Sequence, residues 1–289
     1  MIKFLLLIVV TGCAMNQKKE VDLDNISNKD FDKEKAQKFD YRRDFFTGVS
    51  SENAQALQDE SLYRINSFDS EVKGEDVLTS IVFNCHKGNY DKAFGIIEVQ
   101  NERYRENPSF WNQVGTCFLL KGERRKALMF YNKALEFQPN FAPALNNIGL
   151  MYRKEGNDQK AEVAFSKAVK NSNFSKTPRF NLAQLYLDYG LFNDAIKEFK
   201  VLEDSKDVDV FAGLGSAYLM AGDYENSIRY FKMIDEDFYE WPYIGINAAL
   251  AFYKAGDKDE ARDILDDIDE DKLGPYKGYY EESKKKVGL

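Results

Sequence analysis

Apolar residues recur three and four positions apart along most of the chain after residue 74, with charged residues between them. This spacing predicts amphipathic α-helices, because such positions share one helix face. Glycines separate successive helical stretches and fall at 88, 122, 156, 190, 222 and 256, 34 residues apart except for a 32-residue step between Gly190 and Gly222. The pattern predicts tandem helix–turn–helix units in which a left-handed glycine reverses the chain. We expect the short step to shorten the connection between units around Asp204 to Asp209.

The stretch 108–141 shows the most complete pattern. Its apolar and small residues are Trp111, Val114, Gly115, Phe118, Ala127, Tyr131, Ala134 and Pro139. This order resembles the tetratricopeptide repeat (TPR), whose pattern is W-x2-L-G-x2-Y, then A-x3-F, then P. The resemblance implies an all-α solenoid, in which small residues at the eighth, twentieth and twenty-seventh positions let two helices approach closely. The units are 74–107, 108–141, 142–175, 176–207, 208–241 and 242–275, with capping helices expected at 51–73 and 276–289.

The chain begins with a short apolar run, Phe4 to Val10, after a lysine. A charged start, an apolar run and small residues indicate a secretory signal, and seven apolar residues are too few to span a bilayer. Residues Val10 to Cys13 resemble a bacterial lipobox, which implies cleavage of residues 1–12 and lipidation of Cys13. Two or three acyl chains anchor a protein stably. Residues 13–50 are polar and predict a tether, and Ala14 favours the outer membrane over the inner one.

Charge and composition exclude several function classes. The formal net charge is −8, and the segment from Val201 to the C-terminus holds 21 acids against 11 bases. No basic stripe suited to nucleic acid is present. The sequence has one histidine, no metal-ligand spacing, and a glycine-rich Gly213 to Ser216 that falls inside a predicted helix. We therefore expect no enzyme activity, cofactor, metal or small-molecule substrate. Cys85 and Cys117 could form a disulfide, but two buried free thiols are the favoured interpretation.

The TPR resemblance places ligand contacts in a concave groove lined by the first helix of each unit. The sixth position of consecutive units reads Gln113, Asn147, Asn181, Gly213 and Asn247. A side-chain amide can both donate to and accept from a peptide backbone. The alternative is that these amides serve local structure. The predicted groove residues are Asn112, Gln113, Asn146, Asn147, Arg153, Lys154, Asn181, Asn247 and Tyr253.

These features together predict a lipid-anchored TPR scaffold on the periplasmic side of the outer membrane. It would bind a protein segment in assembling or organising an envelope complex, and its layout resembles type IV pilus pilotins. TPR adaptors of peptidoglycan hydrolases or of outer-membrane protein assembly have a similar layout. The alternative is a soluble intracellular TPR adaptor without an anchor.

Overall fold

The computed structural model describes residues 77–171 and 176–289, which hold thirteen α-helices and no strand. The predicted signal, Cys13, the tether and the helix expected at 51–73 lie outside these residues. The helices alternate as antiparallel pairs, each within one predicted unit. The predicted fold class, an all-α solenoid of helix–turn–helix repeats, is confirmed.

Each pair consists of a first and a second helix. The first helices are α3 (Val77–His86), α5 (Pro108–Leu120), α7 (Ala142–Lys154), α9 (Lys176–Asp188), α11 (Val208–Ala221) and α13 (Pro242–Ala255). The second helices are α4 (Tyr90–Tyr104), α6 (Arg124–Phe137), α8 (Asp158–Asn171), α10 (Phe192–Lys200), α12 (Tyr224–Phe231) and α14 (Lys258–Asp266). Short 3₁₀ turns are η3 (Glu203–Ser205), η4 (Glu236–Glu240), η5 (Glu270–Lys272) and η6 (Gly274–Tyr276), and α15 (Lys277–Val287) ends the chain.

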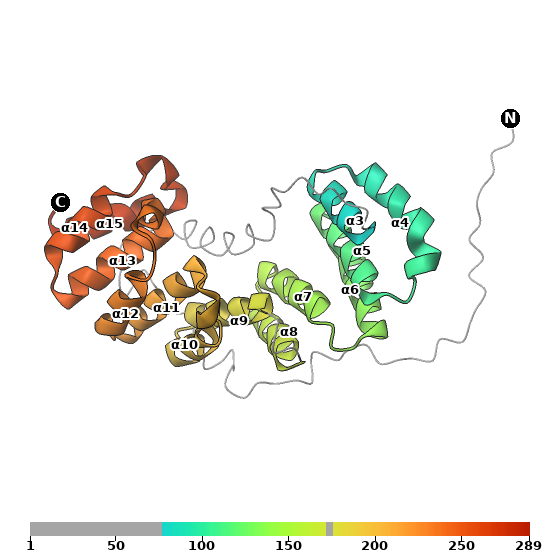
Figure 1. The fold of residues 1–289 in the computed structure, drawn as a ribbon, viewed down its shortest axis with the longest axis horizontal. Coiled ribbons are helices and arrows are strands. Elements are labelled where there is room, and N and C mark those ends of the chain that lie inside the picture. The colour runs from blue at the N-terminus through green and yellow to red at the C-terminus, as the bar shows by residue number, and fades with distance from the viewer. Residues whose placement is uncertain (1–76, 172–175) are drawn as a thin grey trace, which may run out of the picture.

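The pairs follow one another along an arc that runs from α3 and α4 at one end to α14 and α15 at the other (Figure 1). In this view α3, α7 and α13 lie on the inner side of the arc, and their partners α4, α8 and α14 lie on the outer side. Stacking of successive pairs buries the apolar faces that no single pair can bury alone. Successive first helices also contact one another, so the three seen on the inner side belong to one continuous row.

Glycines fix both the turns and the close approach within a pair. The six periodic glycines all have positive φ, between 71° and 96°, where side chains other than glycine are strained. Inside the helices, a Cβ added at Gly149 would lie 2.5 Å from the Phe165 ring. The equivalent Gly115 and Gly215 face the rings of Tyr131 and Phe231 in the same way. The predicted steric role of the eighth position is thus visible in three pairs.

The 32-residue step has a different structural origin from the one we predicted. The second helix α10 has 9 residues, against 14 in α6 and in α8. The connection that follows is longer, since residues 201–207 separate α10 from α11, whereas residues 138–141 separate α6 from α7. The prediction of a shortened connection is wrong, because the missing residues come from the helix.

The C-terminal helix α15 packs against α13 and α14 of the last pair. Tyr279 and Tyr280 are buried at 3% and 2% exposure, and Val287 is buried as well. Lys284 to Lys286 are half-buried or exposed. The helix therefore shields the apolar end of the solenoid and turns its lysines outward.

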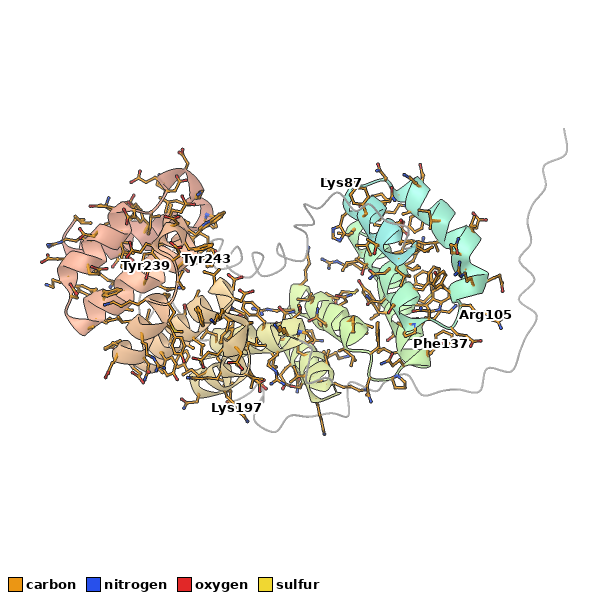
Figure 2. The ribbon with its side chains drawn as sticks, viewed as in Figure 1. Lys87, Arg105, Phe137, Lys197, Tyr239 and Tyr243 are labelled. Atoms are coloured by element: carbon orange, nitrogen blue, oxygen red, sulfur yellow. A yellow bond between two sulfur atoms is a disulfide. The ribbon has the colours of Figure 1, made fainter. Side chains whose placement is uncertain are left out.

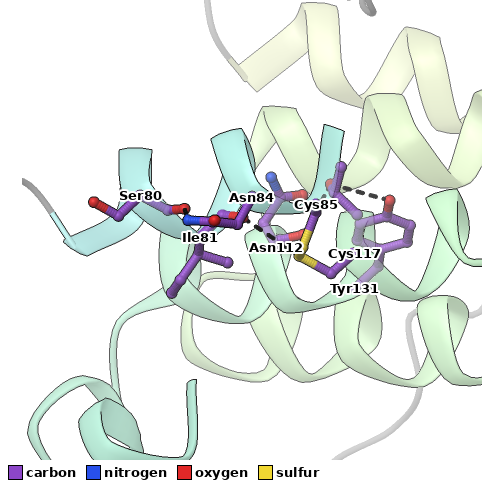
Figure 3. The surroundings of a disulfide bond; sticks show 8 residues. Ser80, Ile81, Asn84, Cys85, Asn112, Cys117 and Tyr131 are labelled. Carbon is purple, nitrogen blue, oxygen red and sulfur yellow. Dashed lines mark hydrogen bonds between the residues drawn. A yellow bond between two sulfur atoms is a disulfide. The ribbon is translucent and has the colours of Figure 1, made fainter. Parts of the chain in front are cut away.

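A disulfide joins α3 to α5 through Cys85 and Cys117 (Figure 3). Their Cα atoms are 5.2 Å apart, within the range that a disulfide requires. The bond is buried beside Ile81, and Tyr131 lies close by. The favoured interpretation of two free thiols is therefore corrected. The sequence allowed this bond without favouring it, because the two positions meet only when adjacent first helices stack.

Candidate functional site

The inner side of the arc is the candidate site. We call it the inner face and define it by the exposed and half-exposed side chains of α5, α7, α9 and α13. All nine predicted groove residues belong to these four first helices. Their burial and hydrogen bonds divide them into two groups with different roles.

Buried amides join neighbouring first helices. Asn147 Nδ2 donates to Asn112 Oδ1 at 3.0 Å, which links α7 to α5. Asn181 Nδ2 donates to Asn146 Oδ1 at 2.8 Å, which links α9 to α7. Asn112, Asn146 and Asn181 are only 5%, 5% and 2% exposed. For these three residues the geometry favours the structural alternative, because their amides hold successive units together.

The row of amides does not continue through α11. Gly213 occupies the corresponding position there, and a Cβ on it would lie 2.6 Å from the Phe199 ring. In α13 the Asn247 amide donates to the carbonyl oxygen of Tyr243, one turn earlier in its own helix, at 3.0 Å. The aromatic core thus excludes an amide at Gly213, and the row divides into a paired part on α5, α7 and α9 and a separate residue on α13.

Arg153 forms an ion pair with Asp188 across α7 and α9. The Arg153 side chain is 8% exposed and that of Asp188 is 28% exposed, so the charge of Arg153 is largely removed from water. A buried guanidinium requires such a partner. Arg153 therefore stabilises the contact between units, and its neighbour Lys154 is the exposed cation of this turn. Sequence reasoning missed Asp188, whose opposite charge 35 positions away was the available signal.

Two buried carboxylates on α8 fix the position of α9. Tyr189 donates to Asp158 at 2.8 Å, and Tyr186 donates to Glu162 at 3.1 Å. Asp158 and Glu162 are 3% and 1% exposed. Burial, together with these carboxylates, raises the pKa of both tyrosines above the ordinary value. The phenols thus remain donors at neutral pH, and this contact between units was not predicted from the sequence.

The remaining predicted residues are accessible from the inner side. Gln113, Asn147, Asn247 and Tyr253 are half-exposed, and Lys154 is exposed. Figure 2 shows Tyr243, one turn before Asn247, on the side of the C-terminal part of the arc that faces its N-terminal part. Amides, a phenol and a cation can bind the backbone and acidic groups of a polypeptide. Half-exposed Leu119, Leu120 and Leu187 add apolar contacts, whereas Leu150, Leu219, Met220, Ile246 and Leu250 are buried.

The described residues also limit the chemistry of the site. Within 77–171 and 176–289, no three His, Cys, Asp or Glu side chains are grouped so as to hold a metal ion. None of the helices in these ranges combines the length and apolarity that a membrane crossing requires. The accessible side chains of the inner face named above are amides, leucines, a phenol and a cation.

Three stretches of the chain match family models of the tetratricopeptide repeat. They cover residues 108–141, 130–163 and 246–270. The first coincides with the unit that carries the most complete pattern. With the helix geometry, these matches identify the fold as a TPR solenoid.

Curated proteins are similar in sequence to part of this chain. The photosystem I assembly protein Ycf3 of Rippkaea orientalis is 32% identical over 88 residues, which are 28% of this chain and 49% of the relative. The BBSome complex member BBS4 of Bos taurus is 30% identical over 89 residues, 31% of this chain and 17% of the relative. The chain thus spans about half, or less, of the length of the curated relatives it matches.

Solved TPR structures superpose over most of the chain. PilF of Pseudomonas aeruginosa gives a TM-score of 0.59 at 15% identity and covers 79% of this chain and 99% of its own. PilW, a type IV pilus biogenesis factor, gives 0.52 at 17% identity, with 73% and 99% covered. YrrB, a TPR protein with an unusual peptide-binding site, gives 0.54 at 18% identity, with 65% and 97% covered. At these identities the similarity establishes the fold alone.

Proposed function

We propose that this protein is a TPR scaffold that binds an extended segment of a partner protein on its inner face. The observation that carries the proposal is the set of accessible amides and leucines on the successive first helices α5, α7 and α9 of one arc. Such a surface suits an extended chain, since amides can pair with its backbone and leucines with its apolar side chains. Peptide binding by YrrB, which has the same fold, is consistent with this use.

The scaffold is further proposed to be lipid-anchored through Cys13 on the periplasmic side of the outer membrane. The lipobox-like Val10 to Cys13 supports the anchor. The Cys85–Cys117 disulfide supports export, because disulfides persist in oxidising compartments and are rare in the cytosol. The likeness to PilF and PilW is consistent with a role in assembling an envelope complex. The rival proposal, an intracellular adaptor, predicts instead that Cys85 and Cys117 are reduced, because the cytosol keeps thiols reduced.

Binding on the inner face is tested with charge-reversal variants of matched exposure. Lys154→Glu alters the exposed cation of α7, whereas Lys197→Glu alters an exposed cation on α10 that lies on the outer side (Figure 2). Cross-linked partners are captured from the native envelope with each variant. We expect Lys154→Glu combined with Asn147→Ala to lose the partner that wild type and Lys197→Glu retain. Equal recovery by all three proteins rejects the inner face as the binding surface.

The anchor is tested independently of binding. Palmitate labelling and membrane fractionation are compared for wild type and Cys13→Ala. We expect the variant to lose both label and membrane association. Unchanged labelling rejects the lipidated cysteine, and an intact mass that retains Met1 favours the intracellular adaptor.

A further inference from the structure

The second helices become shorter in the last three pairs. α4, α6 and α8 have 15, 14 and 14 residues, whereas α10, α12 and α14 have 9, 8 and 9. The residues released from these helices form connections at 201–207, 232–241 and 267–276, which contain η3, η4, and η5 with η6. The first two connections join a second helix to the next first helix, and the third joins α14 to α15, so in a stacked array all three lie along the same edge. We call these three connections the 3₁₀ edge.

Hydrogen bonds tie η3 to the end of α12 and join the second connection directly to the third. Tyr230, the next-to-last residue of α12, donates to Glu203 of η3 at 2.9 Å. The backbone N–H of Asp269 donates to the carbonyl oxygen of Glu240 at 3.1 Å. Lys272 pairs with the Glu240 carboxylate at 2.7 Å. The second and third connections therefore adjoin directly, and η3 of the first is held against the end of α12.

Large apolar side chains are exposed along this edge. Val201 is 56% exposed, Met233 51%, and Phe238 and Trp241 40% each. Among the described residues only eight large apolar side chains are this exposed, and half of them lie in these three short connections. Each costs free energy in water, at about 25 cal/mol per Å² of apolar surface. Gathered exposed apolar side chains of this kind mark an interaction surface.

The same connections are strongly acidic. They contain 11 Asp and Glu and only three lysines. One of these, Lys272, is already paired with Glu240 and Asp269, and its ammonium lies 4.6 Å from the centre of the Trp241 ring. That contact shows that a cation can approach an exposed aromatic ring of this edge. Negative charge around apolar side chains repels an anionic lipid surface and favours a cationic partner.

We propose that the 3₁₀ edge is a second docking surface, which binds a basic amphipathic segment of a partner protein. The apolar face of that segment packs on Met233, Phe238 and Trp241. Its Lys and Arg side chains pair with the surrounding carboxylates, which also accelerate association through electrostatic steering. This surface is separate from the inner face, so it does not depend on the function proposed above.

The test uses an amphipathic peptide of leucine and lysine, about five helical turns long. The chain has two tryptophans, of which Trp111 is 5% exposed and Trp241 is 40% exposed. We expect the peptide to shift tryptophan emission to the blue and to protect the accessible tryptophan from acrylamide. Calorimetry should show roughly tenfold weaker binding by Met233→Ser/Phe238→Ser. Salt should weaken binding by the wild-type protein.

Matched controls make the test decisive. Val99→Ser/Met129→Ser removes apolar side chains elsewhere that are more exposed, at 78% and 55%, and should bind like wild type. Equal binding of a leucine–glutamate peptide, or an unaffected Met233→Ser/Phe238→Ser variant, overturns the proposal. The proposal is also overturned if the wild-type protein binds phosphatidylcholine–phosphatidylglycerol vesicles and the same variant does not. That result would assign the edge to membrane binding. The proposal is also overturned if the protein dimerises without peptide and Met233→Ser/Phe238→Ser abolishes the dimer. The edge would then bind a second copy of the chain.

Discussion

The disulfide between Cys85 and Cys117 should contribute most of the stability of the first helix pair. It closes a loop of 32 residues that contains all of α4, a helix with a single buried residue, Ala93. In the chain-entropy account, opening a loop of this length restores about 12 cal/mol/K to the unfolded segment, or about 3.7 kcal/mol at room temperature. We therefore expect Cys85→Ala/Cys117→Ala to raise the equilibrium constant for local opening of α3 and α4 by roughly 400-fold.

Hydrogen exchange read by mass spectrometry measures this effect directly. Peptides from α3 and α4 should lose protection in the double variant, while peptides from α13 and α14 serve as an internal reference. Cys117→Ala alone should give the same loss, because one remaining thiol cannot form the bond. Protection of α3 and α4 that changes by less than about threefold refutes the entropic reasoning. Alkylation of both cysteines in unreduced protein refutes the bond itself.

Three further predictions concern packing, charge and pH. Gly149→Ala places a Cβ 2.5 Å from the Phe165 ring and should lower the free energy of unfolding by about 1–3 kcal/mol in chemical denaturation. Asp188→Asn leaves Arg153 buried without its anionic partner and should cost about 3–5 kcal/mol, more than Asp188→Asn/Arg153→Met. Burial raises the pKa of Tyr239 to about 12. Its neutral phenol therefore stabilises the fold fully below pH 10, and this stabilisation is lost as pH rises toward 12. In alkaline unfolding curves, Tyr239→Phe should show a smaller loss of stability over this pH range than wild type.

Each of these predictions has a contradicting result. Wild-type stability of Gly149→Ala would mean that the helices separate at little cost, and Gly95→Ala is the control because a Cβ there has open space. If Asp188→Asn and Asp188→Asn/Arg153→Met lose the same free energy of unfolding, the unpaired charge of Arg153 is not the cause of the loss. An alkaline stability curve that Tyr239→Phe leaves unchanged would show that the Tyr239 phenol does not resist ionisation.

The sequence by itself determined the repeating part of this protein. Helical period, turn glycines and the pairing of a small residue such as Gly149 with a ring such as Phe165 recur within one unit of 34 residues, so they can be read along the chain. The resemblance to the TPR pattern placed the groove residues on first helices. It also allowed an amide at Asn147 or Asn181 to be either a ligand contact or a link within the fold.

Only the tertiary structure decided what happens between units. The bond of Cys85 to Cys117, the amide pair of Asn146 and Asn181, and the charge pair of Arg153 each join residues 32 to 35 positions apart. Such contacts depend on how far one unit is shifted and rotated against the next, which no local pattern encodes. The shortened second helices arise in the same way, because tertiary packing outweighs helix propensity where a helix ends. The acidic, apolar 3₁₀ edge therefore became visible only in the folded chain.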